Sequence, residues 1–199
     1  MVNLDQRILR INKAVFMMAV WGLLILLASI INQFFDLPNP DYVLFLWAGV
    51  TLLGIAGQTI SLVRGLQLNL TIWLIVMAIG WVFTFYVVKF DDGAHIELYG
   101  DLAGVWLILL GIGHLFTAFH VVKLFLFLGA LHIAVGLLLE LSARGIVRID
   151  ILDAYSTLIF GLVAGGTLIV ASLPMWYRPA KPAPSPAQVA PVTMSGPQV

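Results

Sequence analysis

Six long apolar stretches organise the sequence, and each is close to the length that a helix needs to cross a bilayer. About 20 consecutive apolar residues span the hydrocarbon core as an α-helix. The stretches cover residues 14–34, 43–63, 70–88, 102–121, 124–141 and 153–173. We therefore predict an all-α polytopic membrane protein, with six transmembrane helices arranged as three antiparallel hairpins.

The composition supports a membrane protein and excludes several other classes. Of the 199 residues, 61% are hydrophobic and 10% are charged, with a mean hydropathy of +1.05. A soluble domain is about 45–50% apolar and about 25% charged. The net charge is zero, so no basic field would recruit nucleic acid. The chain has no cysteine, which excludes disulfides and thiolate metal sites.

The two ends of the chain differ from the central region. Residues 1–13 mix aliphatic side chains with basic ones, which predicts a short amphipathic helix on the cytoplasmic surface of the membrane. Residues 14–177 form the predicted transmembrane bundle. Residues 178–199 are rich in proline, alanine and serine, a composition typical of a disordered tail.

The distribution of basic residues predicts the orientation, because cytoplasmic segments carry an excess of Lys and Arg. With the N-terminus inside, the inner segments hold Arg7, Arg10, Lys13, Arg64, Lys123, Arg178 and Lys181. The outer segments hold only Lys89, Arg144 and Arg148. We therefore expect a multi-pass protein of the cell membrane with both termini in the cytoplasm.

Glycines punctuate the apolar stretches at spacings that favour close helix packing, since small residues let helix backbones approach each other in lipid. Gly161 and Gly165 form one G-x-x-x-G motif, and Gly100 and Gly104 form another. We predict that these four glycines lie at helix contacts within the bundle, with a homo-oligomer contact as the alternative.

The second, fourth and sixth stretches also resemble one another, so the unit is a two-helix hairpin of about 55 residues used three times. The segment 102–141 carries Gly104, Gly111, Gly113, the pair Ala118-Phe119, Gly129 and Gly136. In this glycine pattern and in its predicted topology the chain resembles the HdeD/DUF308 family of small bacterial inner-membrane proteins. The first and third stretches carry fewer glycines than that family, and the tail is additional. The resemblance implies a role in acid-stress response, or as an accessory subunit of a membrane complex, without a catalytic site.

Sequence motifs of catalysis are missing. No nucleophile elbow, zinc-protease motif or phosphate-binding loop occurs, and no Lys, Arg, Asp or Glu lies deep inside a stretch. We therefore expect a non-enzymatic protein without a cofactor. A small transporter or channel is the alternative, and it would need a polar seam lined by Gln58, Thr59, His114 and Thr117. A cluster of acids around residues 91–101 matches no calcium loop and is expected to be a solvated connection.

Two histidines inside the apolar stretches are the remaining candidates. His114 and His132 lie at nearly the same depth on consecutive antiparallel helices, and Gln58 lies at a lower level of its own helix. The three readings of this polar cluster are a hydrogen-bonded packing pair, a pH-sensing pair and axial ligation of a haem. Haem ligation would place the chain in an electron-transfer complex, but neighbouring helices pack about 8–10 Å apart, which is close for a porphyrin.

Overall fold

A computed structural model gives the fold of residues 4–35, 40–61, 67–90, 95–120 and 123–176, and the surroundings of side chains at 15–35, 42–56, 71–88, 102–118 and 123–173. Within these ranges the chain is helical and forms no strand, as the sequence predicts. The elements are α1 (Leu4–Phe34), α2 (Pro40–Ser61), α3 (Gln67–Phe90), α4 (His95–His120), α5 (Leu124–Ala143), α6 (Asp150–Ala154), α7 (Ser156–Phe160), the π-helix η1 (Gly161–Gly166) and α8 (Thr167–Trp176).

Four of the helical segments are long and apolar enough to cross a membrane: Val15–Phe34, Thr71–Val88, Leu124–Ala143 and Ser156–Leu173. The described parts of α2 and α4 contribute shorter apolar stretches, Tyr42–Ala56 and Leu102–Ala118. Large apolar side chains also cover the outside of the bundle, and Phe45, Val82 and Phe127 are each about two-thirds exposed or more. Soluble monomers rarely expose apolar surface on this scale. The described helices are therefore consistent with a membrane protein.

Two helices differ from their sequence predictions. The segment predicted as a separate surface helix over residues 1–13 is helical from Leu4 and continues into the first apolar stretch, because no glycine or proline separates the two. The last apolar stretch is interrupted twice. The chain bends at Tyr155, between α6 and α7, and the glycine-rich run of η1 adopts π-helical hydrogen bonding.

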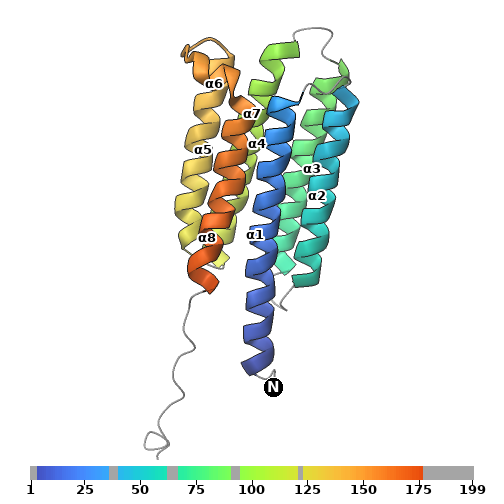
Figure 1. Cartoon of the computed structure of the whole chain (residues 1–199). Coiled ribbons are helices and arrows are strands. Elements are labelled where there is room, and N and C mark those ends of the chain that lie inside the picture. Colours follow the sequence, from blue (N-terminus) through green and yellow to red (C-terminus); the bar gives the residue numbers. More distant parts are fainter. Residues whose placement is uncertain (1–3, 36–39, 62–66, 91–94, 121–122, 177–199) are drawn as a thin grey trace, which may run out of the picture.

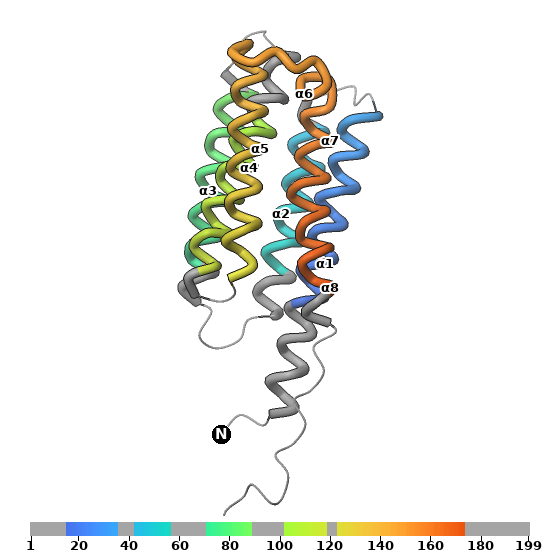
Figure 2. Tube along the Cα trace, turned by 90° about the vertical axis from the view of Figure 1, so that its left-hand side faces the viewer, coloured from blue at the N-terminus to red at the C-terminus, as the bar shows by residue number. Residues whose placement is uncertain are grey.

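The long helices run roughly parallel to one axis (Figures 1 and 2). α1 packs against α2 on one side and against α7, η1 and α8 on the other. α4 packs against α3 and, over most of its length, against α5. α4 also contacts α7, which joins the two groups of helices. The main buried cluster lies where they meet and includes Leu107, Leu139 and Ala164.

The α4–α5 contact depends on paired glycines. A Cβ added to Gly104 would lie 2.9 Å from the carbonyl oxygen of Gly136, and one added to Gly111 would lie 2.8 Å from that of Gly129. Real Cβ atoms do not approach backbone oxygens this closely, so any side chain here would push the helices apart. These four positions let α4 and α5 approach backbone to backbone.

The glycines singled out in the sequence occupy comparable places. Gly161 packs against Ser29 of α1, and Gly165 packs against the backbone of Gly22. Gly104 lies at the α5 contact just described. Gly100 lies in α4, outside the residues whose surroundings are described. Each described member of the predicted set therefore faces a neighbouring helix of the same chain.

Candidate functional site

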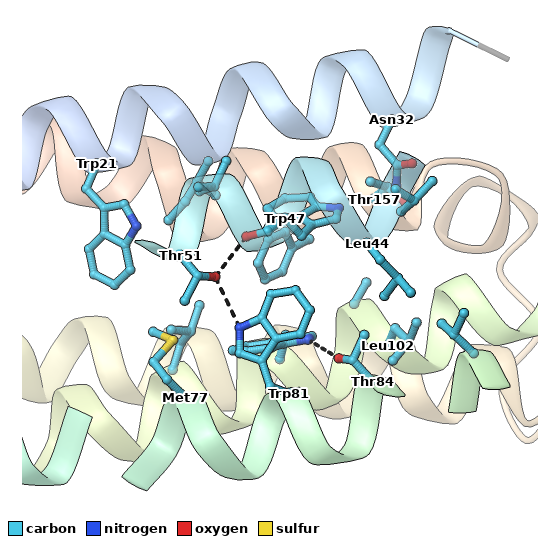
Figure 3. Close-up of a pocket in the computed structure, with 18 residues that line it drawn as sticks. Trp21, Asn32, Leu44, Trp47, Thr51, Met77, Trp81, Thr84, Leu102 and Thr157 are labelled. Carbon is cyan, nitrogen blue, oxygen red and sulfur yellow. Dashed lines mark hydrogen bonds between the residues drawn. The ribbon is translucent and has the colours of Figure 1, made fainter. Parts of the chain in front are cut away.

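An aromatic cavity lies between α1, α2 and α7 on one side and α3 and α4 on the other (Figures 2 and 3). Its volume is about 90 Å³, several times the roughly 10–15 Å³ that one water molecule needs. Aromatic side chains from five helices supply most of the wall: Trp21, Trp47, Trp81, Trp106 and Phe160. The 18 lining residues include no charged side chain. The site is therefore a neutral, largely apolar space inside the bundle.

The cavity has a polar end and an apolar end. Asn32 of α1 and Thr157 of α7 lie at the end of the bundle where α1 finishes and α6 lies, which we call the α6 end (Figure 3). Trp21 and Met77 line the opposite end (Figure 3). Asn32 and Trp21 are 11 residues apart on one helix, so the cavity extends about 16 Å along α1 at 1.5 Å per residue.

The α6 end is fixed by contacts between α1 and the start of α7. The side-chain Nε2 of Gln33 donates to the carbonyl oxygen of Ala154 at 2.9 Å, and its Oε1 accepts from the backbone N–H of Leu158 at 3.3 Å. One glutamine thus pairs backbone groups on both sides of the bend at Tyr155: a carbonyl at the end of α6 and an N–H in the first turn of α7, which helix ends leave unpaired. This arrangement holds Thr157 beside the end of α1.

Hydrogen bonds between tryptophan and threonine join three helices of the cavity wall, α2, α3 and α4 (Figure 3). Trp106 Nε1 donates to Thr84 Oγ1 at 2.9 Å, and Trp81 Nε1 donates to Thr51 Oγ1 at 3.3 Å. Each threonine hydroxyl in turn donates to the carbonyl four residues earlier on its own helix. The hydroxyl therefore acts as a relay that gives an indole N–H an acceptor in an apolar environment. The rings of Trp81 and Trp106 also meet edge to face, 6.2 Å apart.

A third hydrogen bond from a tryptophan to a threonine lies beyond the apolar end of the cavity. Trp73 Nε1 donates to Thr117 Oγ1 at 3.0 Å, and Thr117 donates to the carbonyl of Gly113 at 2.9 Å. Trp73 meets Trp21 edge to face at 6.0 Å, so it closes the apolar end of the cavity. On its other side it contacts His114, with ring centroids 5.1 Å apart.

α2 and α3 pack loosely against each other. These helices follow one another in the chain, yet α2 packs mainly against α1 and α3 mainly against α4. Among the described side chains, the hydrogen bond from Trp81 of α3 to Thr51 of α2 links the two helices, and its length of 3.3 Å makes it a long one. The outward residues beside it, Leu52 and Val82, are strongly exposed and apolar. An apolar molecule could enter here from the surrounding lipid.

The histidine pair lies outside this cavity. His114 and His132 are 2% and 0% exposed, and their ring centroids are 4.8 Å apart with a tilt of 46°. His132 Nδ1 donates to the carbonyl of Leu128 at 2.6 Å, and His114 stacks on Phe125 at 5.4 Å. His114 Nδ1 and His132 Nε2 are buried without a hydrogen-bond partner in the structure.

This geometry bears on the haem alternative. A porphyrin between the two imidazoles would need each ring to turn a nitrogen toward a central iron from opposite sides. The rings instead contact one another and leave no space for a porphyrin plane. The described residues also contain no group of three or more His, Asp or Glu side chains that could hold a metal ion.

The polar seam proposed for a transporter is described only in part. His114 and Thr117 of α4 are buried against Trp73 and do not line the cavity. Gln58 and Thr59 lie in α2, but their side chains fall outside the described set, as does the acidic cluster around residues 91–101. In the described half of the seam, the polar groups are therefore packed together away from the cavity.

The tryptophans of the cavity are not among the predicted site residues. The signal was present in the sequence, because an indole N–H inside an apolar stretch requires an acceptor, and threonines occur in the same stretches. Which threonine serves which tryptophan depends on helix order and rotation, and periodicity does not determine either.

Comparison of the chain with protein families, with curated proteins and with solved structures finds no match. The functional argument therefore depends on the residues and their geometry.

Proposed function

We propose that the chain is a non-enzymatic integral membrane protein that binds an apolar molecule from the bilayer in the aromatic cavity. The observation that carries the proposal is the cavity itself, which is uncharged, aromatic and bordered by the loose α2–α3 contact. Ligand sites are typically apolar cavities with a few placed polar groups, and Asn32 and Thr157 are such groups. The lining holds no His, Asp, Glu, Lys or Cys side chain to act as acid, base or nucleophile.

The proposed topology has six crossings in three antiparallel hairpins, with both termini in the cytoplasm. α2 has 22 residues and α4 has 26, so each is longer than about 30 Å at 1.5 Å per residue. The excess of Lys and Arg in the inner segments supports the orientation. The glycine pattern of segment 102–141 supports an HdeD-like accessory or stress-related role in a bacterial inner membrane.

Reporter fusions test the topology. Fusions after Arg64, Lys123 and Arg178 should report the cytoplasm, and fusions after Pro40 and Gly145 should report the opposite side. One inverted reporter would contradict six crossings.

Lipid extraction tests the binding proposal. The full-length protein, purified in a mild detergent, should retain a stoichiometric lipid that mass spectrometry identifies. Ala103 is buried and lines the cavity, so Ala103→Phe should fill the space and lose this lipid. Ala134 lies on the exposed face of α5, so Ala134→Phe should retain it. Equal retention by both variants would mean that the lipid binds elsewhere.

A further inference from the structure

The residues that line the cavity restrict the charge of the ligand. No charged side chain lines the cavity, and its hydroxyl and indole groups are neutral. A charged head group inside this space would lose its hydration without gaining a counter-ion, which costs several kcal/mol. The part of the ligand inside the cavity is therefore neutral.

The free polar groups restrict the orientation of the ligand. The hydroxyls of Thr51 and Thr84 already accept an indole N–H and donate to a carbonyl. The side chains of Asn32 and Thr157 form no hydrogen bond with any residue in the described structure, although both line the α6 end. An amide and a hydroxyl together offer donors and acceptors to a small polar head.

One more unpaired polar atom lies at the opposite end. Trp21 is 8% exposed, and its buried Nε1 has no hydrogen-bond partner. A Cβ added to Gly54 of α2 would collide with this nitrogen, so the N–H is covered by the α2 backbone. The atom is therefore less accessible to a ligand head than Asn32 and Thr157, and the deep end presents mainly ring faces and Met77.

From these observations we infer that the ligand is a neutral single-chain amphiphile, whose hydroxyl or carbonyl head binds Asn32 and Thr157 while its chain extends toward Trp21. This inference rests on the proposed function and adds the ligand's class and direction. A volume of about 90 Å³ suits one chain rather than a two-chain phospholipid. The chain would lie among the four indoles, where apolar burial provides most of the affinity.

Matched brominated probes test the inference, because bromine in contact with an indole quenches its fluorescence. The full-length protein is placed in nanodiscs of saturated phosphatidylcholine and titrated with 11-bromoundecan-1-ol or with 1-bromoundecane, each expressed as a mole fraction of lipid. Both should show saturable quenching. The alcohol should saturate at about three- to tenfold lower mole fraction, the effect of about one hydrogen bond.

Variants of the cavity test whether Asn32 and Thr157 cause the preference for the alcohol over the alkane. Asn32→Leu combined with Thr157→Val should make the two probes equal without abolishing saturation, whereas Thr157→Ser should keep the preference for the alcohol. Ala103→Phe should remove saturable quenching by both probes, and Ala134→Phe should not. Thermal unfolding of each variant establishes that it is folded before titration.

The outcomes separate the two proposals. Equal saturation by alcohol and alkane in the unmodified protein would overturn the head-group assignment and leave the apolar site standing. Equally tight binding of 11-bromoundecyl-trimethylammonium would overturn the neutral head. Quenching that never saturates, or that Ala103→Phe leaves unchanged, would overturn the binding proposal and the inference together.

Discussion

Gly111 of α4 and Gly129 of α5 meet backbone to backbone. A Cβ on Gly111 would lie 2.8 Å from the carbonyl oxygen of Gly129, and a Cβ on Gly129 would lie 2.9 Å from that of Gly111. The contact is reciprocal, and seven residues along each helix Gly104 and Gly136 repeat it. Lipid provides no hydrophobic force to hold two helices together, so this close packing carries much of the α4–α5 association.

The first prediction concerns this contact. Gly111→Ala should destabilise the bundle by about 1–3 kcal/mol, because the added methyl meets backbone that cannot rotate away. Gly49 of α2 has no atom within 4 Å of an added Cβ, so Gly49→Ala is the matched control and should be neutral or slightly stabilising. Unfolding in mixed micelles with increasing SDS measures both. Equal stability of the two variants would mean that α4 and α5 adjust freely.

A second prediction uses adjacent glycines in η1. Gly165 faces the backbone of Gly22, whereas nothing lies within 4 Å of a Cβ on Gly166. Gly165→Ala should therefore lower the unfolding free energy by about 1–3 kcal/mol. Gly166→Ala should change it by less than about 1 kcal/mol. Because the two positions share one helical segment, a similar loss at both would point to the π-helix itself rather than to the contact with α1.

The helices were largely predictable because membrane insertion imposes a simple length rule. The predicted stretch 124–141 corresponds to α5 (Leu124–Ala143), and 70–88 corresponds to α3 (Gln67–Phe90). The bend at Tyr155 was not predicted. Gln33, a residue more than 120 positions away in the sequence, forms hydrogen bonds with the backbone on both sides of it. Local hydropathy carries no information about such a partner.

The candidate site was less predictable than the helices. The equal depth of His114 and His132 follows from counting residues from a short connection, and their rings do contact each other. Predicting the cavity from the sequence would require knowing which helices are neighbours. Trp21 and Trp106 share it because α1 and α4 both border the centre of the bundle, although 85 positions separate them. Helix order of this kind is a tertiary property.

A third prediction tests the tryptophan–threonine bonds. Thr84→Val keeps the shape of the side chain but leaves Trp106 Nε1 without its acceptor, which should cost about 1–3 kcal/mol. Thr84→Ser retains the hydroxyl and should recover most of the loss. Unfolding of the three proteins under the same conditions gives the comparison. A valine variant as stable as the unmodified protein would show that the bond contributes nothing to the fold.

The histidine pair is a buried polar feature that lies outside the cavity. Its surroundings in the structure are Trp73 and Phe125 together with the backbone of Leu128, and none of these carries a charge. One nitrogen of each ring is buried without a partner. Neutral imidazoles fit such a place, whereas a protonated ring would introduce an uncompensated charge.

The last prediction follows from the cost of burying a protonated histidine ring without a counter-ion. Acidification from about pH 7 to pH 5 covers the range in which histidine commonly gains a proton. Where a ring takes up that proton, folded protein must bury the charge, but unfolded protein exposes it to water, so the unfolding temperature should fall. His114→Phe combined with His132→Phe keeps two aromatic rings and removes both titrating groups, so the fall should be smaller. The measurement is thermal unfolding at several pH values for both proteins in one detergent. Identical profiles would show that the two histidines are packing residues and not a pH sensor.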